Sequence, residues 1–272
     1  MSYRRLAWQS SPYLLKRVRY FMSHLLGTRL QRSHKLYFVT LNGQRFKRLI
    51  LSDSSLASGI ENNLESFGPT APFPPLVACY EREIWLEFID GSPIQTADEQ
   101  LVRKVADFYA TVYARRPHQL DIGESPFLHR LHQDLRFLNQ VGVLTDSLYQ
   151  DLMATAGRLT PQKVWVGFDY TDPVLKNFVI SRPGGRLYAV DVGGLADNQL
   201  IGMGVAKACR RWLGPFREVF FECLVREGVP NFQTYFPFVE LSALAKSTKW
   251  SFFEKKWKAV KPVLFERFRH LS

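Results

Sequence analysis

Several features that would assign the chain to a specialised class are missing from its sequence. The three cysteines, Cys79, Cys209 and Cys223, are too few and too scattered for a disulfide framework or a zinc site, and favour buried thiols in a reducing compartment. No run approaches about 18 uncharged apolar residues, which excludes a transmembrane helix. No repeat with a period of about 20 to 50 residues is present, which argues against a solenoid or a propeller.

What is present suits a globular protein. The 272 residues are 46% hydrophobic and 22% charged, enough apolar mass for a core, so an intrinsically disordered chain is excluded. Glycine (17) and proline (15) occur at ordinary levels, which excludes a collagenous or low-complexity chain. The length predicts one large domain or two small lobes.

The charge is unevenly distributed. Residues 1–52 hold 11 Lys and Arg and no acidic residue, residues 246–272 carry a net charge of +6, and the remainder carries −6. Basic ends indicate a phosphate-rich partner, either nucleic acid or an anionic membrane surface. No zinc-finger spacing and no aromatic-basic RNA-binding pattern appears, so no nucleic-acid partner is predicted.

The N-terminal segment, residues 1–34, contains a predicted basic amphipathic helix. Ser11-Pro12 is a typical helix start and Gly27 a plausible stop. Two interpretations stay open: the helix packs on its own domain, or it lies in an anionic lipid surface. Lys16-Arg17-Val18-Arg19 interrupts the apolar core that a signal peptide needs, which predicts a cytoplasmic protein.

Residues 35–91 read as a small strand-rich lobe. Asn42-Gly43 separates two β-rich runs, Lys35–Thr40 and Arg45–Leu51, and predicts a hairpin because both turn residues tolerate positive φ. A helix that includes Glu61 follows a cap at Asp53, and Leu76–Tyr80 and Glu83–Phe88 read as two further strands.

Residues 92–272 read as a larger helical lobe. Helical spacing runs from Asp98 to about Ala156, and the chain after Asp197 also reads as mostly helical. Between them lie a short predicted strand, Val164–Val166, and a second hairpin, Phe178–Ser181 with Arg186–Val192. The sequence therefore predicts an α+β, two-lobed organisation.

Three polar residues around the second hairpin carry the strongest chemical signal. Asp172 stands five residues before Asn177, which leads into the hairpin, and Asp191 ends its second strand. This order predicts that all three side chains lie at one end of the hairpin. Phosphoryl transfer needs such a set, with a carboxylate at the acceptor hydroxyl and an amide and a carboxylate to hold Mg²⁺ on the phosphates.

At these residues the chain resembles the protein-kinase-like superfamily, in the branch of small-molecule and sugar kinases. The catalytic loop of that branch reads roughly H-G-D-x-x-x-x-N-F, and here the stretch is Tyr170-Thr171-Asp172 followed by Asn177-Phe178. The resemblance implies a bilobal kinase-like fold that uses ATP and Mg²⁺. It also implies that Asp172 is the catalytic base and that Asn177 and Asp191 are the metal ligands.

The resemblance extends over about residues 35–225. It implies that Glu87 and Ile89 offer backbone groups to adenine, and that Lys47 pairs with Glu61 to orient the ATP phosphates. Lys47 and Arg48 are adjacent and must point to opposite faces of their strand, so either could be the phosphate-contacting residue.

Two departures from the family pattern stand out. Tyr170 replaces the catalytic-loop histidine, and no glycine-rich loop precedes the first hairpin. These departures leave open an inactive pseudokinase that acts as a binding module. A weaker metal candidate is the pair His129 and His132, next to Asp134 on a predicted helix.

Within the superfamily the chain looks most like the lipopolysaccharide core kinases, which phosphorylate heptose or Kdo. This resemblance, together with the basic ends, implies a lipid-anchored sugar acceptor and a peripheral position on the cytoplasmic face of the inner membrane. The alternative is a soluble kinase of a small-molecule alcohol, of the aminoglycoside or choline type.

Overall fold

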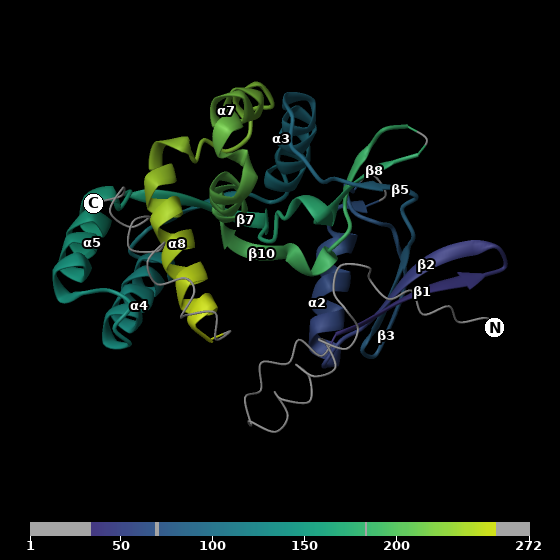
Figure 1. Cartoon of the computed structure of the whole chain (residues 1–272), viewed down its shortest axis with the longest axis horizontal. Coiled ribbons are helices and arrows are strands. Elements are labelled where there is room, and N and C mark those ends of the chain that lie inside the picture. Colours follow the sequence, from purple (N-terminus) through teal and green to yellow (C-terminus); the bar gives the residue numbers. More distant parts are fainter. Residues whose placement is uncertain (1–33, 69–70, 183, 254–272) are drawn as a thin grey trace. The chain divides into compact units, whose positions relative to one another are not determined.

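The computed structural model describes residues 34–68, 71–182 and 184–253. The predicted basic helix of the N-terminal segment, and with it the membrane-surface interpretation, lies outside these residues. The chain divides into two compact units between Asp90 and Gly91. Each unit is described by itself below (Figure 1).

The first unit is an antiparallel sheet with one helix packed on it. The strand order is β1-β2-β4-β3. The strands are β1 (Lys35–Leu41), β2 (Gln44–Ile50), β3 (Leu76–Tyr80) and β4 (Glu83–Glu87), and the helix is α2 (Ser54–Glu65). The hairpin predicted from Asn42-Gly43 is present, with φ of 50° and 79° at these two residues. Both angles lie in the left-handed region that a tight hairpin turn of this kind requires.

Helix α2 begins where the sequence places its cap. The Asp53 carboxylate accepts a hydrogen bond from the Leu56 backbone N–H at 3.0 Å, which satisfies one of the helix's unpaired N-terminal donors. Ala57 and Leu64 face the sheet and are buried, as are Ile84 and Leu86 of β4. The apolar faces of α2 and β4 therefore form the core of this unit.

The second unit is mostly helical. Its main helices are α3 (Glu99–Tyr113), α4 (Phe127–Gln140), α5 (Asp146–Leu159), α6 (Met203–Ala208), α7 (Arg217–Arg226) and α8 (Phe236–Phe253). Short helical turns are η2 (Leu175–Asn177), η3 (Val192–Gly194), the π-helical η4 (Cys209–Leu213), η5 (Gly214–Phe216) and η6 (Gln233–Tyr235). Helix α3 lies beside α7, and α4 lies beside α8 (Figure 1).

Two small sheets complete this unit. One has the order β10-β7-β6 and the other β5-β8-β9, all pairs being antiparallel. Their strands are β5 (Gly91–Pro93), β6 (His118–Asp121), β7 (Lys163–Tyr170), β8 (Phe178–Ser181), β9 (Leu187–Ala189) and β10 (Leu195–Leu200).

Aromatic side chains fill the core where α3 meets β7 and β8. The Phe108 ring meets Tyr109, Tyr170 and Phe178 edge-on, with centroids 5.3 to 5.4 Å apart. Edge-to-face pairs of this kind add to the free energy gained from burying the rings. This cluster anchors the end of β7 and the start of β8, the two strands that flank Asp172 and Asn177.

The α+β class and the strand-rich and helical parts are confirmed, whereas three local predictions are wrong. The strand predicted as Val164–Val166 is the eight-residue β7. The strands β6 and β10 occur in stretches expected to be helical. Strand β7 is buried along most of its length, so it lacks the alternation that marks a half-buried strand, and its partners are distant in the sequence.

Across the described ranges, none of the helices is both long and apolar enough to cross a lipid bilayer.

Candidate active site

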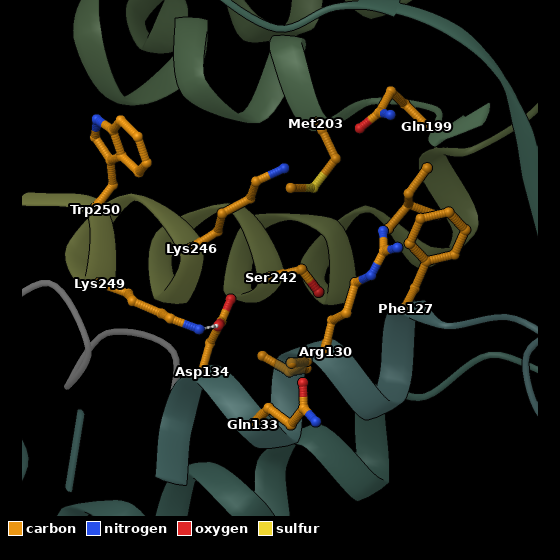
Figure 2. A pocket seen from close by; sticks show the side chains of 12 residues that line it. Phe127, Arg130, Gln133, Asp134, Gln199, Met203, Ser242, Lys246, Lys249 and Trp250 are labelled. Carbon is orange, nitrogen blue, oxygen red and sulfur yellow. Dashed lines mark hydrogen bonds and ion pairs between the residues drawn. The ribbon is translucent and has the colours of Figure 1, made fainter. Parts of the chain in front are cut away.

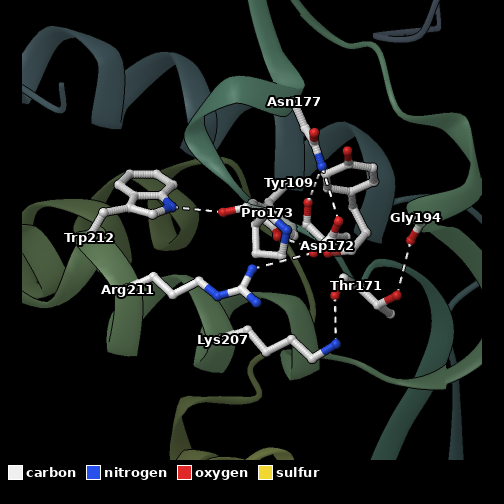
Figure 3. A network of polar contacts seen from close by, with 10 residues as sticks. Tyr109, Thr171, Asp172, Pro173, Asn177, Gly194, Lys207, Arg211 and Trp212 are labelled. Atoms are coloured by element: carbon white, nitrogen blue, oxygen red, sulfur yellow. Dashed lines mark hydrogen bonds and ion pairs between the residues drawn. The ribbon is translucent and has the colours of Figure 1, made fainter. Parts of the chain in front are cut away.

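Asp172 and Asn177 are held together in one short loop. Strand β7 ends at Tyr170, and the chain crosses the loop and the turn η2 before β8 begins at Phe178. The Asn177 side-chain amide donates to the Asp172 backbone oxygen at 3.0 Å and to its Oδ2 at 3.1 Å (Figure 3). Asn177 is buried and the Asp172 carboxylate is partly exposed. The loop therefore exposes a carboxylate to solvent while the buried Asn177 holds it in place.

Backbone hydrogen bonds bring Asp191 to the same loop. The Val190 N–H donates to the Asn177 carbonyl at 2.8 Å, directly before Asp191. Beyond it, the Thr171 N–H donates to the Gly194 carbonyl at 2.7 Å. The residues on both sides of Asp191 are thus tied to the segment that carries Asp172 and Asn177.

Tyr170, which replaces the expected histidine, is buried behind these residues. Burial raises the pKa of its phenol well above 10, and the carboxylates of Asp191 and Asp172 raise it further. Its ring also explains the glycine at 194, because a Cβ there would lie 2.7 Å from a Tyr170 ring carbon. The phenol therefore stays neutral and its ring supports both loops.

Three residues of α6 and η4 contact the loop that carries Asp172, and sequence reasoning missed all three. Lys207 Nζ donates to the Thr171 carbonyl at 2.7 Å, and Trp212 Nε1 donates to the Pro173 carbonyl at 2.7 Å. The Arg211 guanidinium lies 3.3 Å from Asp172 Oδ1 (Figure 3). No local pattern could have linked residues 35 or more positions apart, because only the chain's return through β10 brings α6 to this loop.

The electrostatic surroundings of Asp172 are mixed. Burial lowers the pKa of Lys207 to about 8, as do the nearby cations Lys246 and Arg211, while Asp169 and Asp172 oppose the shift. The ion pair between Arg211 and Asp172 is half exposed, so we expect it to contribute at most about 1 kcal/mol to stability. Its main effect is to place positive charge beside the carboxylate.

Asp169 joins the end of β7 to the start of α6. Its Oδ2 accepts the Gly204 N–H at 2.8 Å and its Oδ1 accepts the Tyr113 hydroxyl at 3.2 Å. Burial nevertheless raises the pKa of this carboxyl to about 6, because desolvation outweighs the hydrogen bonds and the nearby Lys207. Asp169 therefore aligns α6 and its Lys207 with the loop that carries Asp172.

This raised pKa predicts a pH-dependent stability. Between about pH 4 and pH 6 the folded chain binds a proton at Asp169 that the unfolded chain has lost, so stability falls as the pH rises. The expected loss is about 3 kcal/mol. The Asp169→Asn variant is expected to lack this component, so the parent-minus-variant difference in unfolding free energy should decrease across this range. Urea denaturation at pH 4 to 7 measures it; a difference that stays constant contradicts the assignment.

In the first unit, the structure distinguishes Lys47 from Arg48. Arg48 is paired with Glu83 and its guanidinium lies 5.3 Å from the centre of the Trp85 ring. Lys47 stands opposite Leu86 in the register, on the other face of the sheet. Leu86 is fully buried on the side that α2 covers. Lys47 therefore lies on the face of the sheet that α2 covers, and Arg48 lies on the opposite face, where it pairs with Glu83.

Glu61 lies on that same side of the sheet. Burial raises the pKa of the Cys79 thiol of β3, and the neighbouring Glu61 carboxylate raises it further. Cys79 stands opposite Ile84, which shares a face with Leu86 and Lys47. The Lys47–Glu61 pairing remains a prediction. Both residues lie on the side of the sheet that the pairing requires.

Glu87 and Ile89 follow at the end of β4. The Glu87 N–H donates to the Pro75 carbonyl at 2.9 Å. The next N–H, that of Phe88, donates to the Arg45 carbonyl at 3.2 Å. An adenine contact by Glu87 would therefore use its carbonyl oxygen, and the roles predicted for Glu87 and Ile89 stay predictions.

The weaker metal candidate gains no support. His129 lies 2.7 Å from the Gln133 amide, and Asp134 is paired with Lys249. No group of three His, Cys, Asp or Glu suited to a metal ion occurs among the residues whose placement is described.

Known structures share this architecture. The choline kinase LicA from Streptococcus pneumoniae matches 96% of this chain and 99% of its own, with a TM-score of 0.66 and 14% identity. The macrolide 2'-phosphotransferase MphH from Brachybacterium faecium matches 85% of this chain and 86% of its own, with a TM-score of 0.62 and 12% identity. A thermostable mutant of the aminoglycoside phosphotransferase APH(4)-Ia matches 93% of this chain and 95% of its own, with a TM-score of 0.57 and 13% identity.

These likenesses extend over nearly the whole chain and show that it has a protein-kinase-like fold, as the catalytic-loop resemblance predicted. No protein-family model matches the sequence. No curated protein sequence matches it either.

Proposed function

We propose that the protein is a Mg²⁺- and ATP-dependent phosphotransferase that acts on a hydroxyl group of a small molecule. The observation that carries this proposal is the association of Asp172, Asn177 and Asp191 through the hydrogen bonds of one loop. The protein-kinase-like fold supports it, as does a structure of LicA in complex with AMP among the similar proteins.

In this proposal Asp172 orients the acceptor hydroxyl and accepts its proton as the oxygen attacks phosphorus. The partly exposed carboxylate is accessible to an acceptor, and Asn177 holds it in place. Arg211 and Lys207 place positive charge next to the loop, where the negative charge of the transferring group would gather. Tyr170 supports the loop from behind.

The donor set suits magnesium. Mg²⁺ prefers oxygen ligands and keeps waters and substrate phosphates in its coordination sphere, so two protein ligands suffice. Asn177 uses its amide N–H group on Asp172, which leaves its carbonyl oxygen for a cation beside the Asp191 carboxylate. When bound, ATP would supply the phosphoryl group, and the Mg²⁺ held by Asn177 and Asp191 would neutralise charge on the phosphate oxygens.

The comparisons favour the small-molecule alternative over a lipopolysaccharide-core kinase. The similar structures are named for choline, macrolides and aminoglycosides, and nothing in them supports a heptose or Kdo acceptor. The prediction of a lipid-anchored acceptor depends on the lipopolysaccharide-kinase resemblance and on the basic ends, and the N-terminal basic segment lies outside the described residues. We therefore propose a small-molecule acceptor.

Nucleotide binding with and without Mg²⁺ tests the proposal. We expect ATP to bind the full chain in calorimetry, with an affinity that falls when EDTA removes the metal, and ATP turnover to rise when a suitable hydroxyl compound is added. If ATP binds neither in Mg²⁺ nor in EDTA, the proposal is contradicted. Metal-dependent ATP binding without turnover on any acceptor would indicate the inactive pseudokinase instead.

A further inference from the structure

A pocket in the second unit lies apart from the loop contacts described above. It has a volume of about 430 Å³, within the range of ligand sites. Helices α4 and α8 form two of its walls, and the end of β10 and the start of α6 form the rest (Figure 2). Leu131, Leu200 and Met203 make its apolar surface, and Trp250 adds an aromatic ring at its edge.

The pocket has an excess of positive charge. Arg130, Lys246 and Lys249 line it, with Asp134 as the one acidic residue among the lining residues that the structure describes. Asp134 is already paired with Lys249 at 2.6 Å. Neither Arg130 nor Lys246 forms an ion pair with any described residue, and their side chains extend from α4 and α8 (Figure 2). Two positive charges are therefore left for a ligand.

Ser242 supplies an independent sign of a ligand. It lines the pocket and is more than nine-tenths buried, yet its hydroxyl has no hydrogen-bond partner among the described residues. Burying a hydroxyl without a partner costs about 1–3 kcal/mol. Ser242, Lys246 and Lys249 follow one another at helical spacing on one face of α8. The hydroxyl and the two cations therefore line the same pocket.

Helix α6 connects the pocket to the loop that carries Asp172. Met203 lines the pocket, and Lys207 stands one helical turn later on the same face. Lys207 in turn donates to the Thr171 carbonyl, next to Asp172. The positive charge of Lys246 also lowers the pKa of Lys207.

We propose that this pocket binds the acceptor through a carboxylate or phosphate group, so that the phosphorylated hydroxyl belongs to an anionic compound with an apolar or sugar portion. The inference rests on the proposed phosphotransferase function and specifies its substrate class. Two cations and a buried hydroxyl donor match an anion and repel the quaternary ammonium of choline or the amines of an aminoglycoside.

Displacement of 8-anilinonaphthalene-1-sulfonate, an apolar anion with environment-sensitive fluorescence, tests the pocket independently of catalysis. Glucose 6-phosphate, glucose, choline and kanamycin compete against it on the full chain. We expect glucose 6-phosphate to displace half of the probe at a concentration at least about tenfold lower than glucose does. Choline and kanamycin should need the highest concentrations. A truncated lipopolysaccharide with a phosphorylated core distinguishes a lipid-linked anionic sugar from a free one; stronger displacement by either supports the proposal.

The variants Lys246→Gln and Arg130→Gln are each expected to weaken displacement by the anionic competitors about tenfold, and Ser242→Ala several-fold. Lys163→Gln, which removes one exposed charge at the start of β7, is the matched control and should leave it unchanged. Tighter displacement by choline or kanamycin, or unaltered affinity in the pocket variants, overturns the proposal. A chain that binds the anionic sugar but not Mg·ATP would instead contradict the phosphotransferase function and leave the pocket's anion preference standing.

Discussion

Replacing Asp191 with alanine is expected to abolish Mg²⁺-dependent ATP binding while the fold is retained. The carboxylate is half buried after an apolar strand, beside the buried Tyr170, where a charge is costly unless a cation or a cleft receives it. The contacts that position this residue come from the backbone, through the Val190 N–H and the Asp191 carbonyl, and alanine keeps them. Calorimetry with ATP in Mg²⁺ and in EDTA measures the effect.

Asp151→Ala is the matched control for this experiment. Asp151 is exposed on α5, so its loss removes the same charge away from the loop and should not alter ATP binding. Circular dichroism and thermal unfolding check that both variants are folded. If Asp191→Ala binds Mg·ATP as tightly as the parent, the metal-ligand assignment is wrong.

The Asp172→Asn variant is expected to keep its affinity for ATP and to lose at least about 10²-fold in turnover, the scale for losing a positioned base. The amide oxygen can still accept the hydrogen bond from Asn177, so the loop should keep its shape. What disappears is the group that takes the acceptor's proton. Turnover on an acceptor that the parent phosphorylates gives the measurement.

Arg211→Gln separates the loss of the base from the loss of an ion pair. This variant breaks the contact with Asp172 but keeps the carboxylate. A smaller loss of turnover in Arg211→Gln than in Asp172→Asn supports the role of Asp172 as base. Unchanged turnover in Asp172→Asn would remove that residue from the mechanism.

Tyr170 illustrates how a departure from a family pattern can be accommodated. The sequence shows only that tyrosine stands where the resemblance expects histidine. In the structure its ring packs against Phe108 and Phe178 and against the backbone at Gly194. The tyrosine ring thus provides a packed support behind the segments that carry Asp172 and Asp191, and the loop contacts exist without the histidine.

The sequence alone determined the features that depend on neighbouring residues. The Asn42-Gly43 turn, the Asp53 cap of α2 and the hairpin after Asn177 follow from backbone preferences and side-chain hydrogen bonds within a few residues. The α+β division followed from the local spacing of apolar residues. The catalytic-loop resemblance could be recognised because Asp172 and Asn177 lie close together in the chain.

Only the tertiary structure decided which distant residues meet. Which of Lys47 and Arg48 faces α2 depended on which side of the sheet the helix covers. Lys207, Arg211 and Trp212 reach the loop that carries Asp172 because β10 pairs with β7 and returns the chain to it. Likewise, the cationic pocket exists only where α4 packs beside α8. Such contacts depend on long-range pairing and packing, which leave no periodic signal in the local sequence.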